Sequence, residues 1–312
     1  MVREGNSREV GDESSAFEAA VMREGKSQLE VDSRVLEKLG DRQEKEGSLP
    51  EILEFYRALL RIQVEARAAI STAQPGLTKT KVSVQIRKGI PLLKWDALSA
   101  DWPTFQNLFQ AAIAAIDEHT TSECESLRKV AADTALLEEA TRIWYEGSSL
   151  SPWAGSHGID EELLAAAIHC AIKPFLTSKA ESLIGLVPQK QWRREYCPIC
   201  GGKPDFAYLD KERGSRWLVC SRCDSEWLFQ RLGCPYCGNN DPEAQAYFAS
   251  EDDLYRLYTC QSCKTYLKAI DLRHIESEVL LPLERVLTVD MDRQGQEQGY
   301  RGGWAGTAPD EQ

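Results

Sequence analysis

The stretch from Cys197 to Cys263 reads CPIC at 197–200, CSRC at 220–223, CPYC at 234–237 and CQSC at 260–263. It therefore holds eight of the ten cysteines of the chain, arranged as four Cys-x-x-Cys pairs. Such a pair directs both sulfurs inward from one tight turn, and two pairs joined by a hairpin complete a tetrahedral tetrathiolate site. Gly201 and Gly238 follow the first and third pairs, where a positive φ would end the turn. The pattern predicts metal sites.

The spacing of the pairs indicates how they are shared. The gaps 201–219 and 238–259 each suit two strands and a turn, whereas the gap 224–233 between the inner pairs is shorter. Local pairing is therefore favoured, although a cross-braced arrangement in which the first and third pairs share a metal stays open. We assign one metal ion to Cys197, Cys200, Cys220 and Cys223, and a second to Cys234, Cys237, Cys260 and Cys263.

A disulfide framework is the alternative for so many cysteines. It is typical of short secreted domains, whereas this chain has 312 residues and its first residues, MVREGNS, lack the apolar core of a secretory leader. We therefore expect thiolates in the reducing cytoplasm. The formal charge of −12 argues against binding to nucleic acid, and no apolar run is long enough to predict membrane insertion.

Composition and periodicity divide the chain into five segments. Residues 1–47 are polar and are expected to be largely mobile, apart from a short amphipathic helix near 29–39. Residues 48–190 predict an all-helical domain, 191–229 a first metal module, 230–273 a second metal module, and 274–312 a short helix with a disordered tail. The predicted fold class is α+β, with a helical N-terminal domain followed by two tandem rubredoxin-like or zinc-ribbon modules.

Capping signals place the helices of the predicted helical domain. Ser48, with Pro50 and Glu51 behind it, is typical of a helix N-terminus, and Asp101 precedes another helix. Residues 127–144 read as one helix and 147–158 as a loop rich in breakers. Asp160 leads into a helix that Pro174 is expected to bend or end, and residues 175–184 are expected to continue helically until Gly185. About five to seven helices packed as a bundle are expected.

Alternating apolar residues predict two hairpins within the metal modules. The first joins residues 203–210 to 215–220, and the second joins 245–249 to 254–260. Trp217, Trp227, Tyr208 and Tyr258 are interpreted as the small core that shields the sulfurs.

The ordered run of motifs resembles the formate dehydrogenase accessory (formation) protein E family. The matching segments are YCPICGGKP at 196–204, GSRWLVCSRCDSEW at 214–227, RLGCPYCG at 231–238 and YTCQSCKTYLK at 258–268. The helical region 49–187 matches more loosely, in helix pattern and position. One segment departs from the family pattern: residues 280–290 read LLPLERVLTVD, with Pro282 and without the expected acidic pair.

The resemblance implies a cytoplasmic, non-enzymatic assembly factor with a helical domain and two rubredoxin-like modules. Its implied partner is the catalytic subunit of a respiratory formate dehydrogenase, which such factors bind before export. The resemblance favours iron at the cysteine sites, whereas four thiolates by themselves accept Zn or Fe equally.

The remaining candidate residues have ordinary structural interpretations. Cys124 and Cys170 lie in helical stretches without a Cys-x-x-Cys neighbour and are read as buried thiols, and His169 as a core histidine. Arg216, Arg222 and Arg231 are read as solvated surface. The other histidines, His119, His157 and His274, share no motif, and the chain shows no catalytic triad order or phosphate-binding loop.

Three functions are compatible with four cysteine pairs beside a helical domain. The first is the assembly factor described above. The second is a ribbon-type nucleic-acid binder, which the acidic balance opposes. The third is a small electron carrier with an iron–tetrathiolate site, for which a large helical domain is unnecessary.

Overall fold

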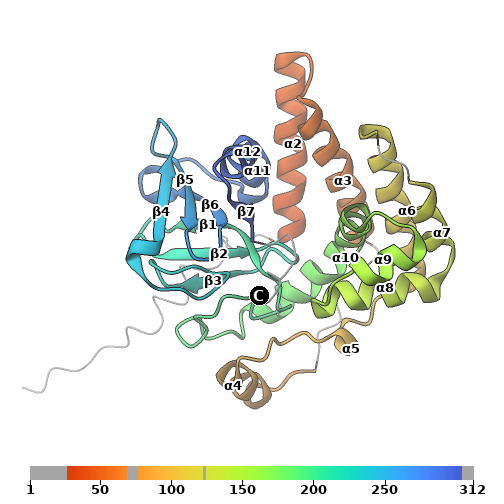
Figure 1. Ribbon diagram of the computed structural model, residues 1–312, viewed down its shortest axis with the longest axis horizontal. Coiled ribbons are helices and arrows are strands. Elements are labelled where there is room, and N and C mark those ends of the chain that lie inside the picture. Colours follow the sequence, from red (N-terminus) through yellow and green to blue (C-terminus); the bar gives the residue numbers. More distant parts are fainter. Residues whose placement is uncertain (1–26, 69, 71–75, 122–123, 304–312) are drawn as a thin grey trace, which may run out of the picture.

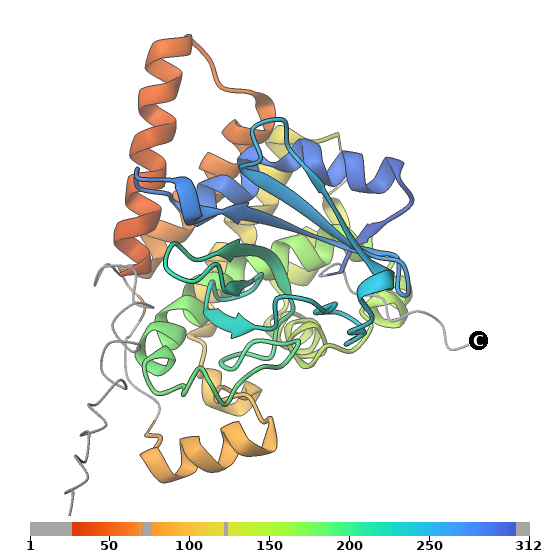
Figure 2. The same cartoon turned by 90° about the vertical axis from the view of Figure 1, so that its left-hand side faces the viewer.

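The computed structural model describes residues 27–68, 70, 76–121 and 124–303. A helical part lies on one side of the molecule and a β-sheet on the other (Figure 1). Figure 2 shows the sheet from the side that faces away from the helices of the helical part. The helices are α2 (Gln28–Glu46), α3 (Glu51–Arg67), α4 (Lys79–Lys88), α5 (Trp95–Leu98), α6 (Trp102–His119), α7 (Glu125–Ala132), α8 (Thr134–Glu146), α9 (Ser151–His157), α10 (Glu161–Ile184), α11 (Leu281–Leu287) and α12 (Val289–Glu297). The strands are β1 (Pro204–Leu209), β2 (Arg216–Cys220), β3 (Glu226–Phe229), β4 (Gln245–Ala249), β5 (Tyr255–Cys260), β6 (Thr265–Asp271) and β7 (Arg301–Gly302).

The expected fold class is confirmed: helices are followed by a β region that holds two clusters of four cysteines. Helix α2 begins at a capping box in which Ser27 and Glu30 bond reciprocally, and it packs on α3 through Val31, Val35 and Leu39. The amphipathic helix expected near 29–39 is therefore confirmed, and it is longer than expected, so residues 40–46 differ from the mobile segment predicted around it. Residues 1–26 lie outside the described part.

Several helix boundaries differ from the prediction. Helix α3 starts at Glu51 behind Pro50, with no cap from Ser48, because Pro50 itself occupies the N-cap position. The stretch 127–144 is split into α7 and α8 at Asp133, whose carboxylate accepts from the first amides of α8. Residues 151–157 form α9 instead of a loop. Eight helices thus lie between residues 48 and 190 in the part that the structure describes, against the five to seven expected.

Helix α10 runs through Pro174 to Ile184, so the helical continuation expected over 175–184 is confirmed and the helix does not end at the proline. A proline lacks the amide that would bond to the carbonyl four residues earlier, here that of Cys170. The side-chain amide of Gln63 on α3 donates to this carbonyl at 3.1 Å. The orphaned acceptor is therefore satisfied by a neighbouring helix, and α10 remains one 24-residue element.

The two metal modules share one sheet. Its strand order is β3-β2-β1-β6-β5-β4, with β7 beside β6. Each module contributes an antiparallel three-stranded unit, and the modules join where β1 pairs parallel with β6, Phe206 opposite Lys268 and Leu209 opposite Asp271. Both predicted hairpins are present; strands β3 and β6, which follow the second cysteine pair of each module, were not predicted.

The C-terminal segment is more ordered than expected. Instead of one short helix, α11 and α12 follow each other, and Arg301 and Gly302 then add to β6 as strand β7. Helix α11 packs against α2 and α3 through Leu280 and Leu283. The end of the predicted disordered tail, residues 304–312, lies outside the described residues.

The helical part and the first module share a continuous core. Cys197, Cys200 and Trp227 belong to the same buried cluster as Phe105 and Leu176 of the helices. Main-chain hydrogen bonds from the segment before α5 also reach the first cysteine pair, with the Leu92 and Leu93 amides bonded to the Pro198 and Ile199 carbonyls at 2.9 and 2.8 Å. Among the described residues, no helix combines the length and apolar character that crossing a membrane requires.

Candidate metal centres

The first cluster consists of Cys197, Cys200, Cys220 and Cys223. Its first pair lies in the loop before β1, and its second pair lies at the turn between β2 and β3. The Sγ atom of Cys200 lies 3.5 Å from the Sγ atoms of Cys220 and Cys223. The Sγ atoms of Cys197 and Cys223 lie 3.6 Å apart. Sulfurs at tetrahedral positions about 2.3 Å from one metal would be roughly 3.8 Å apart, whereas a disulfide would be about 2.05 Å long. The first cluster is positioned to bind a metal ion.

The second cluster consists of Cys234, Cys237, Cys260 and Cys263. It repeats the arrangement of the first, with one pair before β4 and the other at the turn between β5 and β6. Its Sγ atoms lie 3.6 Å apart between Cys234 and Cys263, and 3.8 Å apart between Cys237 and Cys260. In both clusters all four sulfurs lie within 4.8 Å of one another. The structure thus gathers the cysteines in the local sets and not in the cross-braced one.

Each cysteine pair is directly followed by a residue with a positive φ. Gly201 and Gly238 have φ of 76° and 71°, as the sequence predicted. Asp224 and Lys264 take the same role after the second pair of each cluster, with φ of 55° and 53°. These two were missed because neither residue type marks a left-handed turn. The turn also aims an amide at the first sulfur of the pair, as between the Ile199 amide and Cys197 Sγ at 3.4 Å.

The two clusters differ in exposure. All four cysteines of the first cluster are buried, whereas in the second Cys237 is exposed and Cys263 is half-buried. Burial raises the pKa of Cys197 well above its ordinary value. Partial burial raises the pKa of Cys260, but hydrogen bonds from the Cys263 main-chain amide and the Gln245 side-chain amide outweigh it and lower this pKa to about 7. A divalent or trivalent cation would release the thiol protons and share the thiolate charge, so the donor set fits Zn or Fe.

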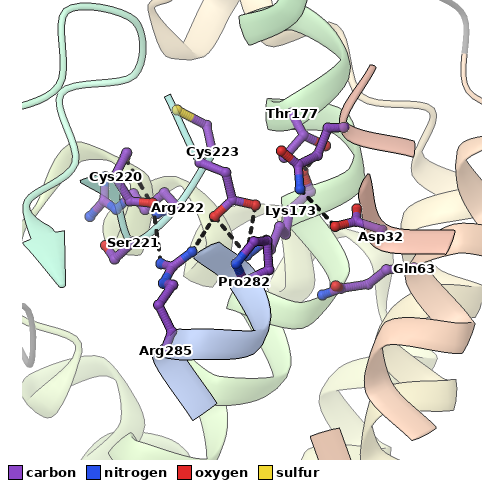
Figure 3. A network of polar contacts seen from close by, with 12 residues as sticks. Asp32, Gln63, Lys173, Thr177, Cys220, Ser221, Arg222, Cys223, Pro282 and Arg285 are labelled. Carbon is purple, nitrogen blue, oxygen red and sulfur yellow. Dashed lines mark hydrogen bonds and ion pairs between the residues drawn. The ribbon is translucent and has the colours of Figure 1, made fainter. Parts of the chain in front are cut away.

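A network of buried charges fixes the first cluster between the helices and the C-terminal segment (Figure 3). Asp224, directly after Cys223, accepts from Lys173 of α10 at 3.0 Å and pairs with Arg285 of α11. Arg285 also forms an ion pair with Asp205 at 2.5 Å and donates to the Cys220 carbonyl at 3.3 Å. The network therefore joins three segments that lie far apart in the sequence.

The aromatic residues of the sheet and two of the arginines take structural roles. Trp227 is buried in the core that holds the first-cluster cysteines, and the half-buried Tyr258 packs against that core, as predicted. Tyr208 and Trp217 are buried in a separate core without cysteines, so they do not shield the sulfurs. Arg216, interpreted as solvated surface, is buried: it donates to the Gly233 carbonyl at 2.6 Å and lies over the rings of Phe229 and Tyr258. The sequence could not show this, because the aromatic residues that cover Arg216 come from other strands.

Arg222 is half-buried and also anchored, since its guanidinium donates to the carbonyls of Trp144 and Tyr145 on α8 at 3.0 and 2.9 Å. His169 is confirmed as a core histidine: it contacts the Ser221 carbonyl at 2.9 Å, and burial lowers its pKa to about 4. Cys124 and Cys170 are buried thiols outside both clusters.

A cleft of about 920 Å³ opens between the clusters. Its walls include Cys200 of the first cluster, Cys237 and Cys263 of the second, and Trp95 and Tyr145 of the helical part. Both clusters and the helices thus contribute to one concave surface.

Comparison with known proteins identifies the family. The family model described as "FdhE, central domain" matches residues 196–231, which hold the whole first cluster. A "Protein FdhE homolog" of Aquifex aeolicus (strain VF5) is 29% identical over 254 residues, covering 80% of this chain and 85% of the relative. The family model, the sequence relatives and a solved structure all support the FdhE family.

A second sequence relative and a solved structure agree with this assignment. The FdhE homologue of Pseudomonas aeruginosa is 29% identical over 215 residues, which cover 65% of this chain and 62% of the relative. The crystal structure of the FdhE protein from Pseudomonas aeruginosa matches with a TM-score of 0.57 at 20% identity, over 87% of this chain and 92% of that chain. The structural match shows that the fold is shared. The resemblance drawn from the cysteine motifs is thereby confirmed.

Proposed function

We propose that this protein is a cytoplasmic maturation factor that binds the catalytic subunit of a respiratory formate dehydrogenase without oxidising formate itself. Membership of the FdhE family is the observation that carries the proposal. In this proposal each cluster holds one metal ion through its four cysteines, with iron favoured over zinc by the family resemblance.

The geometry supports a binding role. The cleft is lined by both clusters and by the helical part, so a docked segment would contact all three together. Its volume lies at the upper end of the roughly 300–1,000 Å³ typical of ligand pockets. The walls are firm, because the hydroxyls of Tyr145 and Tyr236 donate to the Leu93 and Pro204 carbonyls at 2.8 and 2.9 Å. Such preorganised aromatic walls lower the entropic cost of binding.

The metal ions would hold this surface in shape, since each joins two separate turns of the sheet. An iron ion in the second cluster would in addition change its charge by one unit on reduction, beside an exposed cysteine. That change would alter the contact with a bound client electrostatically.

Deletion of the gene, followed by complementation, tests the role. The deletion should lower formate dehydrogenase activity while transcript and polypeptide synthesis continue. The wild-type gene should restore activity, and a Cys234→Ser/Cys237→Ser variant should not. A Cys124→Ser/Cys170→Ser variant changes two thiols outside the clusters and should restore activity. Normal activity in the deletion strain would contradict the proposal.

A further inference from the structure

Strand β4 is an open edge of the sheet. Among the described residues it pairs only with β5. It lies on the side of the sheet away from the helical part (Figure 1). At its two ends, the Ala244 carbonyl accepts from the Gln261 amide and the Ser250 amide donates to the Tyr255 carbonyl, both on the β5 side of the hairpin. Because bonding direction alternates along an antiparallel pair, the main-chain groups of Tyr247 and Ala249 point to the open edge, whereas the Gln245 amide is bonded to the Pro242 carbonyl.

The open edge is apolar and lacks the usual protection. Natural edge strands carry charges, prolines or bulges that prevent pairing with another strand. Strand β4 has the sequence QAYFA, without charge or proline, and its register with β5 is regular. Tyr247 and Phe248, on opposite faces of the strand, are 54% and 39% exposed. A strand added beside β4 would therefore cover an aromatic ring on each face.

Both ends of β4 are strongly acidic. Residues 238–255 contain no Lys or Arg, and their five carboxylates flank the strand on either side. All five are exposed and, within the described part of the chain, none forms an ion pair. They are Asp241 and Glu243 before the strand, and Glu251, Asp252 and Asp253 after it.

This charge pattern selects the partner. A second copy of the chain, paired through its own β4 in either direction, would place acidic ends beside acidic ends, and the like charges would repel. A strand with basic ends would instead gain attraction at both ends. Main-chain hydrogen bonds to the edge would supply affinity, as in other complexes formed by strand addition.

We propose that β4 is a docking edge for an extended segment of a partner protein that has an apolar centre and Lys or Arg at both ends. The segment adds to the sheet as a further strand beside β4. This surface is separate from the cleft and from the first cluster, and it touches the second cluster only through Gln245, whose side-chain amide donates to Cys260 Sγ at 3.5 Å. It does not depend on the identity of the client proposed above.

A fluorescence anisotropy titration of the full-length, metal-loaded protein tests this proposal. The probe is a labelled peptide with two lysines at each end and alternating valine and threonine between them. Two comparison peptides carry glutamates in place of the lysines, or prolines at alternate central positions that block strand pairing. The lysine peptide should bind, and both comparison peptides should bind at least about tenfold more weakly.

Variants of the protein separate edge docking from unspecific attraction to an acidic chain. Tyr247→Lys should weaken binding of the lysine peptide by about tenfold, whereas Glu243→Lys/Glu251→Lys should shift the preference toward the glutamate peptide. The control Glu138→Lys/Glu139→Lys makes the same charge change on exposed residues of α8 and should leave binding unchanged. Circular dichroism checks that each variant is folded. Failure of the lysine peptide to bind, equal binding of the proline peptide, or a dimer that Tyr247→Lys dissociates would each overturn the proposal.

Discussion

Arg285 of α11 forms an ion pair with Asp224, the residue that directly follows Cys223 of the first cluster. The side chains of Asp224 and Arg285 are only 2% and 11% exposed. Arg285 lies in the C-terminal segment 280–290, and the ion pair connects that segment to the first cluster.

Replacement of Arg285 by alanine should strongly destabilise the protein. It would leave the Asp205 and Asp224 carboxylates without their main cation, and breaking a buried ion pair from one side costs about 3–5 kcal/mol. Urea denaturation of the metal-loaded protein measures the free energy of unfolding. The control Arg293→Ala removes an exposed pair with Asp290 and should change it by less than about 0.5 kcal/mol. Equal effects of both substitutions would show that the network contributes little.

The second cluster should lose its metal first. Cys237 is exposed and Cys263 half-buried, whereas the first cluster is buried throughout, so a chelator reaches the second site more readily. Zinc-loaded protein mixed with a chromogenic chelator should release one metal equivalent quickly and the other slowly. Cys237→Ser should remove only the fast phase, and Cys200→Ser only the slow phase. A single phase for both ions would contradict the difference in access.

Loss of the first metal should destabilise the helices as well as the sheet. Cys197, Cys200 and Trp227 lie in one core with α6 and α10, so the first module and the helical part are expected to unfold together. Thermal unfolding of the helical circular dichroism signal should shift downward by about 10 °C or more in Cys200→Ala, which corresponds to a few kcal/mol. The matched Cys237→Ala variant should shift it much less. A helical transition unchanged in Cys200→Ala would instead support an independent domain ending near Lys190.

Asp32 should make stability depend on pH. Burial raises the pKa of Asp32 to about 6, with repulsion from Asp224 adding to the effect and Lys173, Gln28 and Arg67 opposing it. Because the pKa is higher in the folded than in the unfolded state, the contribution of Asp32 is fully present below about pH 4 and is lost as pH rises through 6.

The Asp32→Asn variant removes this titration. Its free energy of unfolding should exceed that of the wild type by about 1–3 kcal/mol at pH 8, and the difference should shrink toward zero near pH 4. Urea denaturation at a series of pH values measures it, and Asp41→Asn, on the same helix but exposed, serves as control. A difference that grows as pH falls would contradict the assignment.

The cysteine clusters were predictable because their geometry is local. A Cys-x-x-Cys turn directs both of its sulfurs to the same side within four residues. The gap lengths then allow a hairpin between the two pairs of each set. Helix starts with an acidic cap were equally predictable, as Asp101 and Asp160 show. The prediction of a cap at Ser48 was wrong because Pro50 occupies the N-cap position of α3.

The joining of the modules was not predictable, because it depends on contacts distant in sequence. Strand β1 pairs with β6 more than fifty residues later, and no local pattern marks a parallel partner. The side chain that satisfies the Cys170 carbonyl opposite Pro174 comes likewise from another helix, at Gln63. Arg285 reads as an ordinary surface arginine until the fold places Asp205 and Asp224 around it.

The proposed function requires that the metal-loaded protein bind the catalytic subunit of a formate dehydrogenase. Affinity purification of the tagged protein from cells respiring on formate, followed by quantitative mass spectrometry, tests it most directly. We expect the catalytic subunit to be strongly enriched with the wild type and with Cys124→Ser/Cys170→Ser, and to be lost with Cys234→Ser/Cys237→Ser. Recovery of the wild type without the catalytic subunit, or equal enrichment with all three proteins, would contradict it.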